Sequence, residues 1–575
     1  MFTQTSEIKQ TEPRKTVEIH LPDGRVYSAN RGTPVGLFLK VLPEASNPPI
    51  MGAVVNNELR ELTYPIEMDS YVRPITMSDE DGARIYRRSV TFLLEAAFDE
   101  LFPEAILKVD HSVSSGGFYC EVTGREPLSM EELTSLEGRM QEMVRQDLPF
   151  ERKVIPLKEA IEHFQKSGQL EKVRLLKYRQ KEFLVLYRLG NHFDYHHGYM
   201  LPSTGYVRWF SISKMGEGYV LRFPRRQAPD RLLPMPSYPK LLATFHQYGD
   251  WLERLGIESV GALNDAIDQG RSQEIILVSE ALHDQNITAI AEEIAEKSKE
   301  VRIILISGPS SSGKTTFSRR LAIQILALGF SPYALEMDNY FIDRDLTPLD
   351  EYGEKDFEAL GAVNTTRLGS DLEKLILGEE VQLPHYNFKE GRSENGEVIS
   401  LKNDQIIILE GIHGLNPALL LGIDPKTTHR VYVSCLTQLN LDRHNRISTT
   451  DSRLIRRIVR DATTRGYSAQ QTIARWDSVQ RGEKHNIFPF QENADNLFNS
   501  ALVYELSVLK PLVEPLLRQV PYGTNEYIEA KRLLALLEWF LPVPSEIIPD
   551  NSILREFVGG SILGYFRGWQ ESNYS

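Results

Sequence analysis

Residues 303–316 read IILISGPSSSGKTT, and this stretch decides the fold of the C-terminal half of the chain. Gly308, four further residues and then Gly313-Lys314-Thr315 satisfy the pattern G-x-x-x-x-G-K-[ST]. The apolar run before the loop predicts a central strand, and the apolar residues that recur with helical spacing after it predict a helix. A loop that joins a strand to a helix N-terminus is typical of a site for the phosphates of a nucleoside triphosphate.

Each position of this loop has a physical role. The two glycines allow backbone conformations that a side chain would forbid, so that successive amide groups can point at phosphate oxygens. Lys314 is expected to reach the β- and γ-phosphates, and the Thr315 hydroxyl is expected to ligate Mg²⁺. The residues expected to bind ATP are Gly308, Ser310, Ser311, Ser312, Gly313, Lys314, Thr315 and Thr316.

The size and composition of the chain set limits on its class. A chain of 575 residues is too long for one hydrophobic core, so several domains are expected. The net charge of −14 disfavours a general nucleic-acid coat protein, although a local basic groove remains compatible with it. Two cysteines, Cys120 and Cys435, form neither a disulfide framework nor a metal-ligand pattern, which favours a reducing, cytoplasmic location. The N-terminus has no apolar targeting segment, and no run approaches eighteen apolar residues, so we expect no membrane span.

Five segments can be distinguished by pattern. Residues 15–77 contain strand patterns that alternate around turn-forming residues. Residues 78–226 mix helical and strand patterns. Residues 227–299 begin with a proline-rich linker and continue as amphipathic helices. In residues 300–522 apolar strands alternate with helices, which predicts a parallel sheet with helices on both faces. Residues 523–575 are expected to be a helical tail. The predicted fold class is therefore multidomain, α/β in the C-terminal half and α+β before it.

Two acidic residues follow predicted strands of the parallel sheet. Asp338 ends the strand in SPYALEMDNYF, where a carboxylate beside the triphosphate can accept a proton from an attacking hydroxyl. The alternative interpretation of Asp338 is a helix-capping or turn residue. Glu410 ends the buried strand in DQIIILEG and is expected to bind Mg²⁺ or its water shell, the alternative being a solvated strand end.

An arginine-rich helix is predicted within residues 451–466, DSRLIRRIVRDATTRG. Four arginines on one helical face repel one another unless an anion lies among them, which predicts a lid over the triphosphate. Asp461 can pair with one of them, so not all need be catalytic. The arginines of this face are Arg453, Arg456, Arg457 and Arg460, with Arg465 just beyond.

Taken together, these motifs resemble the uridine kinase and phosphoribulokinase family of P-loop kinases. The resemblance implies an ATP- and Mg²⁺-dependent nucleoside kinase that phosphorylates a 5′-hydroxyl, with Asp338 as general base. Lys314, Arg456 and Arg460 would act in catalysis, while Arg453 and Arg457 would hold ATP. The segments that carry the resemblance are GPSSSGKTT, EMDNYF, LPHYNF, ILEGIHGL and RLIRRIVRD.

The residues expected at the acceptor site depart from the family's pattern. The resemblance implies that Tyr386 with Phe388 lines a base pocket, but the stretch DFEALGAVN replaces the family's usual ribose-binding sequence, and KEGRSENGE lacks its histidine. Asp356 or Glu358 could supply the missing carboxylate. The preferred nucleobase stays open, and a sugar phosphate or another small alcohol remains an alternative acceptor. The expected acceptor-binding residues are Asp338, Tyr340, Glu358, Tyr386, Phe388 and Arg392.

The first 226 residues resemble parts of another family. The start, VEIHLPDGRVYSANRGTPVGLFL, resembles a TGS domain, and the following region resembles the second additional, editing domain of threonyl-tRNA synthetases. That domain relies on H-x-x-x-H and C-x-x-x-H pairs. Here the first reads His111 to Ser115, and the second places His196 and Met200 at its two positions, so three of the four positions differ.

The histidines of this region allow two interpretations. His111, His192, His196 and His197 could gather a metal, but we favour polar residues that line a vestigial pocket. No aminoacylation domain is recognised, so we do not expect a tRNA ligase. The alternative function is a tRNA-associated protein that uses ATP as a switch, and a homo-oligomer is left open.

Overall fold

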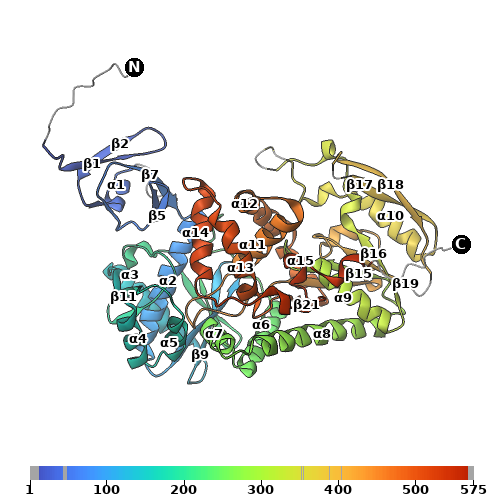
Figure 1. Ribbon diagram of the computed structural model, residues 1–575, viewed down its shortest axis with the longest axis horizontal. Helices are drawn as coiled ribbons and strands as arrows, with labels where there is room; N and C mark the ends of the chain where they lie inside the picture. The colour runs from blue at the N-terminus through green and yellow to red at the C-terminus, as the bar shows by residue number, and fades with distance from the viewer. Residues whose placement is uncertain are drawn as a thin grey trace, which may run out of the picture.

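The computed structural model describes residues 12–42, 48–350, 353, 355–387, 389–402 and 405–566. The strand-rich N-terminal part and the editing-like part lie at one end of the molecule, and the parallel sheet lies at the other (Figure 1). The C-terminal helices lie between them. The predicted multidomain fold is confirmed.

The N-terminal part is a five-stranded sheet with a short helix, in the arrangement of a β-grasp domain. The strand order is β2-β1-β7-β4-β5, and β1 runs parallel to β7, while the other pairs are antiparallel. The core of this part joins Val35, Phe38 and Leu39 of the helix to Val17 and Ile19 of the first strand. The elements are β1 (Thr16–His20), β2 (Val26–Asn30), β3 (Thr33–Pro34), α1 (Val35–Lys40), β4 (Ile50–Val55), β5 (Glu58–Arg60), β6 (Pro65–Ile66) and β7 (Ser70–Thr76).

The editing-like part packs two antiparallel sheets around a buried helix, α2. The sheets have the orders β13-β14-β9-β8 and β10-β11-β12. α3 begins with a capping box, in which Ser129 and Glu132 satisfy each other's backbone amides. The elements are α2 (Glu80–Leu101), β8 (Ile106–Val113), β9 (Gly117–Thr123), α3 (Met130–Gln146), β10 (Glu151–Pro156), α4 (Leu157–Lys166), α5 (Leu170–Lys177), β11 (Phe183–Leu189), β12 (His192–Asp194), β13 (Ser211–Met215) and β14 (Gly218–Arg222).

The C-terminal half contains a five-stranded parallel sheet of order β16-β19-β15-β20-β21. Alternate residues of β15 face opposite sides, because successive side chains of a strand point to opposite faces. Ile304 and Ile306 belong to the core that includes α9, whereas Ile303 and Leu305 belong to the core that includes α10. The sheet therefore carries helices on both faces, as predicted. Its strands are β15 (Ile303–Ser307), β16 (Ser331–Glu336), β19 (Gln405–Glu410), β20 (Thr428–Ser434) and β21 (Asn496–Asn499).

Further helices and a hairpin surround this sheet. The segment 227–299, expected to be a linker followed by helices, contributes α6 (Pro239–Leu255), α7 (Val260–Asp268) and the long α8 (Ser272–Glu296), which packs along α9 (Figure 1). A hairpin of β17 and β18 projects at the far end of the molecule. The remaining elements are α9 (Lys314–Ala327), α10 (Thr365–Ile376), β17 (Val381–Asn387), β18 (Arg392–Ile399), α11 (Thr449–Arg460), α12 (Ala469–Asn486) and α13 (Glu505–Arg518).

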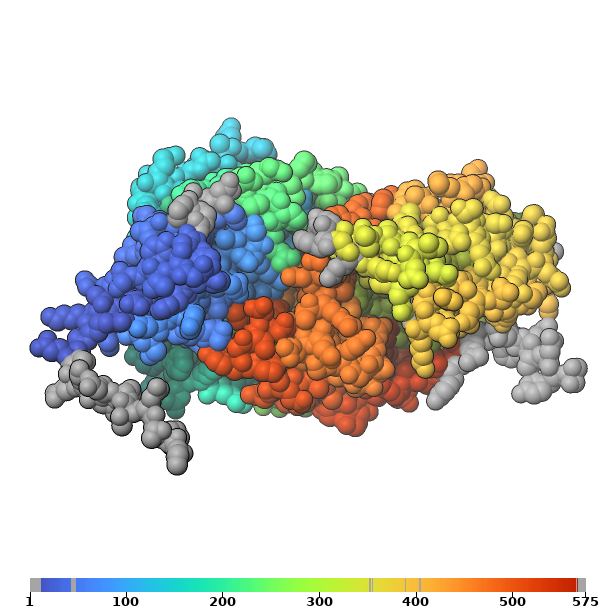
Figure 2. Space-filling view, turned by 90° about the horizontal axis from the view of Figure 1, so that it is seen from above, coloured from blue at the N-terminus to red at the C-terminus, as the bar shows by residue number. Residues whose placement is uncertain are grey.

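The C-terminal helices connect the two halves of the molecule. α14 (Asn525–Leu537) contacts the β-grasp part through the Lys531–Glu58 ion pair at 3.0 Å and α2 through the Arg84–Glu529 ion pair at 2.8 Å. In the view from above, C-terminal residues fill the space between the two ends (Figure 2). α15 (Arg555–Val558) returns to α11. Among the described helices, none is long and apolar enough to cross a membrane.

Candidate functional site

The phosphate loop lies between β15 and α9, as its sequence predicts. Gly313 has a φ of 84°, and Ser311 also has a positive φ, so the backbone makes the tight turns that expose amide groups. A Cβ at Gly308 would lie 2.0 Å from the backbone oxygen of Val433, so only glycine fits against β20 there. The chain after Gly313 enters α9 directly, which places Lys314, Thr315 and the next residues in the helix's first turn.

Carboxylates surround the loop at the carboxyl edge of the sheet. Because β16, β19 and β15 are parallel neighbours, the ends of β16 and β19 meet beside the loop. The Thr315 hydroxyl donates to Glu410 Oε1 at 2.9 Å, so the two oxygen ligands expected for Mg²⁺ are brought together. Asp338 lies in the 3₁₀ turn Met337–Tyr340 that follows β16. A hydroxyl and a carboxylate suit Mg²⁺, which prefers oxygen ligands.

The acid groups of this site share an electrostatic environment. Burial raises the pKa of Glu410 to about 7 and that of Glu358 to about 7, while the nearby Lys314 ammonium opposes both shifts. Asp338 is exposed, yet neighbouring protein atoms remove part of its hydration and raise its pKa, and Lys314 again opposes the shift. The charge of Lys314 thus acts on all three carboxyl groups. Because Glu358 is one of the groups that respond to it, Glu358 belongs to this site.

The arginine-rich helix, α11, is a core helix rather than the predicted lid. It packs against α12, α13 and α15, and eight of its residues are buried. Arg456 is fully buried and forms an ion pair with Glu505 at 2.5 Å. This guanidinium also donates to backbone oxygens of Ser311, at 3.4 Å, and Ser500, at 2.8 Å. The predicted catalytic role of Arg456 is therefore replaced by a positioning role, because its charge is satisfied within the core.

The other arginines reach the loop in different ways. Arg453 donates to the Ser310 carbonyl at 2.9 Å and pairs with Glu483, and Arg457 donates to the Ser310 hydroxyl at 2.8 Å. Asp461, expected to pair with one arginine, pairs with Arg457, Arg460 and Arg465 at 3.3, 3.0 and 3.6 Å. The half-exposed Arg465 acts electrostatically on Asp338, which makes it the arginine with the clearest connection to the expected base.

Two glutamates that sequence reasoning missed accept hydrogen bonds from the loop. Glu483 of α12 accepts the Ser310 amide at 2.8 Å. Glu556 of α15 accepts both the Thr316 amide, at 3.1 Å, and the Thr316 hydroxyl, at 3.0 Å. These donors belong to the loop and to the first turn of α9, where phosphate oxygens are expected. No local motif identifies either glutamate, since each comes from a helix more than 160 residues later in the chain.

The expected acceptor residues are only partly brought together. Tyr340 and Tyr386 are buried, and the Tyr386 ring packs edge-on against Phe341 with centroids 5.6 Å apart. The Tyr386 ring lies within the packing of the protein, and its expected place in the lining of a base pocket stays a prediction. Arg392 is exposed at the start of β18. Phe388 lies outside the described residues. Asp356 accepts the Glu358 amide at 3.0 Å, and the pKa of Glu358 responds to the charges of Lys314 and Asp338.

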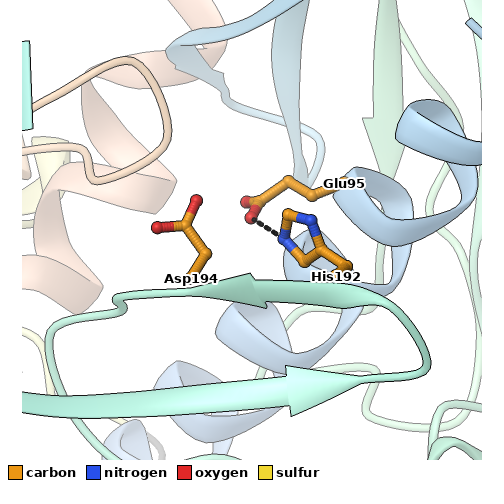
Figure 3. Close-up of side chains that lie close together, drawn as sticks. All are labelled: Glu95, His192 and Asp194. Atoms are coloured by element: carbon orange, nitrogen blue, oxygen red, sulfur yellow. Dashed lines mark hydrogen bonds and ion pairs between the residues drawn. The ribbon is translucent and has the colours of Figure 1, made fainter. Parts of the chain in front are cut away.

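The histidines of the editing-like part do not gather as a four-histidine site. His111 pairs with Asp110 at 2.8 Å and stacks on Phe245, and burial lowers the pKa of His197 to about 3. Within the described residues, Glu95, His192 and Asp194 form the one group whose ligand atoms lie within 4.8 Å of one another (Figure 3).

This buried group is satisfied by internal ion pairs rather than by a metal. Lys172 Nζ bonds both oxygens of Asp194, and His444, from the C-terminal half, contacts Asp194 at 2.9 Å. Burial opposes ionisation of Glu95, but the charges of neighbouring histidines hold its pKa below its usual range. An ammonium at the carboxylate already supplies the positive charge that a metal would bring, so the cluster does not fit a metal site. The interpretation of a vestigial polar pocket stays a prediction.

Comparison with known proteins finds different relatives for the two halves of the chain. Residues 303–506 match the family model described as Phosphoribulokinase / Uridine kinase family. The N-terminal region matches threonine–tRNA ligases. The ligase of Aromatoleum aromaticum is 32% identical over 202 residues, which are 35% of this chain and 32% of the ligase, and that of Marinobacter nauticus is 35% identical over 166 residues, 29% and 26% of the two chains. This chain thus spans about a third of the length of the curated relatives it matches.

Solved kinase structures also resemble part of the chain. One is described as a possible uridine kinase from Bacillus stearothermophilus, with 18% identity, a TM-score of 0.24 and coverage of 35% of this chain and 89% of that one. Another is a D-glycerate 3-kinase from Cryptococcus neoformans var. grubii, with 15% identity, a TM-score of 0.21 and coverage of 46% and 89%. The resemblance predicted from the motifs is confirmed by the family match.

Proposed function

From the premise that residues 303–506 form a P-loop domain of the phosphoribulokinase / uridine kinase type, we propose that this protein is an ATP- and Mg²⁺-dependent kinase of an alcohol group. The acceptor we propose is the 5′-hydroxyl of a nucleoside, as in nucleotide salvage. The observation that carries this proposal is the contact of Thr315 with Glu410 beside Lys314 and Asp338. It joins a triphosphate loop, a pair of metal ligands and a candidate base at one edge of the sheet.

In the proposed mechanism Asp338 accepts the proton of the attacking hydroxyl. Loss of hydration raises its pKa above that of an ordinary aspartate, which makes its ionised form a stronger base. Lys314 and Arg465 neutralise charge on the transferred phosphoryl, and Arg457 and Arg453 fix the loop that holds it. Thr315 and Glu410 would hold Mg²⁺, which would supply positive charge to neutralise the triphosphate.

The charges of the site favour an uncharged acceptor over a sugar phosphate. Burial is the largest cause of the raised pKa of Glu358 and of Glu410, and the negative charge of Asp338 adds to both shifts. A phosphorylated acceptor would meet their like charge, whereas a nucleoside would not. In this proposal Glu358 accepts a hydrogen bond from a ribose hydroxyl. Arg392, one of the expected acceptor-binding residues, lies exposed at the start of β18.

The proposal is tested by ADP release from the purified full-length chain with ATP and Mg²⁺. The acceptor panel holds the common ribo- and deoxyribonucleosides, ribulose 5-phosphate and pantothenate, and Asp338→Asn is the control. Turnover with one nucleoside that is lost in the variant supports the proposal. Turnover only with ribulose 5-phosphate, or none while ATP still binds, contradicts it.

A second candidate function follows from the match of the N-terminal region to threonine–tRNA ligases. In this alternative the first two parts bind a tRNA and the P-loop domain acts as an ATP-driven switch. A switch needs no acceptor base, so Asp338→Asn would leave its ATP turnover unchanged. Stimulation of ATP hydrolysis by tRNA, insensitive to Asp338→Asn, would favour this alternative.

A further inference from the structure

A cleft of about 540 Å³ lies between the editing-like part and the C-terminal half, away from Lys314 and Asp338. Its walls come from α2, from the segment after β14 and from α11, α12 and α14. The lining includes Glu483 and Arg453, which also contact the phosphate loop at Ser310. The cleft is therefore a second concave site, separate from the proposed kinase centre but connected to its loop.

The lining of this cleft is basic in a chain whose net charge is −14. Eleven lysine or arginine side chains line it, against five aspartate or glutamate side chains. Six of the cations are paired with acids, for example Arg532 with Asp451 and Lys531 with Glu58. Five of the lysine and arginine side chains that line the cleft have no carboxylate oxygen of a described residue within 4.0 Å, the limit for an ion pair. They are Arg87, Arg88, Arg225, Arg446 and Lys484.

Three of these unpaired cations come from three different parts of the chain. Arg87 lies on α2, Arg225 follows β14, and Lys484 lies on α12. Burial lowers the pKa of Arg87 to about 9, and repulsion from Arg84, Arg88 and Arg225 adds to the shift. Burial lowers the pKa of Lys484 to about 8, with added repulsion from Arg226 and Arg225. Cations that are half-buried, unpaired and mutually repelling are stabilised by an anion placed among them.

The rest of the lining adds donors and apolar surface. The side-chain nitrogens of Gln480 and Gln491 and the Ser114 hydroxyl are buried without a hydrogen-bond partner among the described residues, and all three residues line the cleft. Phe118, Phe223, Phe245 and Phe488 supply aromatic walls. The volume falls within the range of small-molecule pockets, and aromatic rings favour a planar group.

We propose that this cleft binds a phosphate-bearing small molecule of mononucleotide size, with its phosphate held by Arg87, Arg225 and Lys484. Such a ligand would join the editing-like part to the P-loop half, because its phosphate contacts come from both. It would also reach the kinase loop through α12, where Lys484 neighbours the Glu483 that accepts the Ser310 amide. The proposal does not depend on the identity of the kinase acceptor.

The test uses the full-length chain with Lys314→Ala, which weakens phosphate binding at the kinase loop and leaves the cleft intact. AMP and pyrophosphate are titrated into it by calorimetry. We expect saturable binding of at least AMP, weakened tenfold or more by adding Arg87→Gln or Lys484→Gln. Lys531→Gln is the matched control, because Lys531 lines the same cleft but is already paired with Glu58. That change should alter the affinity less than twofold.

Three results would overturn the proposal. The first is no saturable binding of either probe. The second is equal weakening by all three variants, which would reveal only a diffuse electrostatic field. The third is binding of an RNA 3′ end without binding of AMP, which would make the cleft an RNA site. Thermal melting checks folding, and the two test variants on separate helices keep the experiment decisive if one of them fails to fold.

Discussion

Replacing Glu556 by glutamine should strengthen ATP binding. The Glu556 carboxylate accepts the Thr316 amide and hydroxyl at 3.1 and 3.0 Å, in the first turn of α9. A phosphate that uses the same donors must displace this carboxylate, so Glu556 acts as an internal competitor of the triphosphate. The residue also adds negative charge beside Glu410, whose pKa it helps to raise.

The size of the effect follows from these contacts. A hydrogen bond to a charged acceptor stabilises by about 1.5–3 kcal/mol and one to a neutral acceptor by about 0.5–1.5 kcal/mol. Loss of the favourable interaction between a carboxylate and the helix N-terminus adds about 0.3–1 kcal/mol. The competing contact should weaken by about 1.5–2 kcal/mol, which corresponds to ATP binding about 10- to 30-fold tighter.

The assay is a calorimetric titration of MgATP into the wild-type and Glu556→Gln chains at pH 7.5. Glu546→Gln is the control, since Glu546 is an exposed residue of the same C-terminal segment. It should leave the Kd unchanged. An unchanged or weaker affinity in Glu556→Gln would refute the reasoning, because it would show that the phosphates do not compete for the Thr316 donors.

Other changes test the remaining parts of the site. Lys314→Ala should lower kcat/KM at least about 100-fold in steady-state assays, since it removes the cation shared by the site carboxylates. The pKa of Glu410 is about 7 in the folded chain, whereas that of an unfolded glutamate is about 4.3. The folded state therefore binds the Glu410 proton more tightly than the unfolded state does. For this reason the free energy of unfolding decreases as the pH rises from about 4.3 to about 7. Glu410→Gln should therefore raise stability at pH 8 without Mg²⁺, by on the order of 2 kcal/mol, with little change at pH 4, as followed by urea unfolding. For the same reason wild-type kcat/KM should rise with pH up to about 7, because Mg²⁺ binding needs the ionised carboxylate. Arg456→Met should destabilise the fold by about 3–5 kcal/mol, since it leaves the Glu505 charge buried and unpaired, and Glu505→Leu in the same chain should restore most of this loss in urea unfolding.

The loop and the strand-end carboxylates could be located from the sequence because their signals are local. The pattern around Gly313 fixes the loop, and a carboxylate at the end of a parallel strand must lie at the ligand edge of the sheet. Asp338 and Glu410 therefore come together beside Lys314 without further information. Glu358 was harder to assign, and the structure places it by its packing against Gly482 of α12.

The rest of the site depends on long-range packing that the sequence does not reveal. Helical spacing places four arginines on one face of α11, but it cannot say that this face includes Arg456 in a core ion pair. Glu483 and Glu556 reach the loop from helices far along the chain. The sequence pattern pointed to four histidines of the N-terminal region, whereas His444 of the other half joins His192 and His196 around Glu95.

The central claim is phosphoryl transfer to a nucleoside, and mass spectrometry of the reaction products tests it most directly. The chain is incubated with MgATP and a mixture of nucleosides, in parallel with Asp338→Asn. We predict one nucleoside 5′-monophosphate, formed in step with ADP and absent from the variant. ADP without any phosphorylated nucleoside, or a product that the variant forms equally well, would contradict the account.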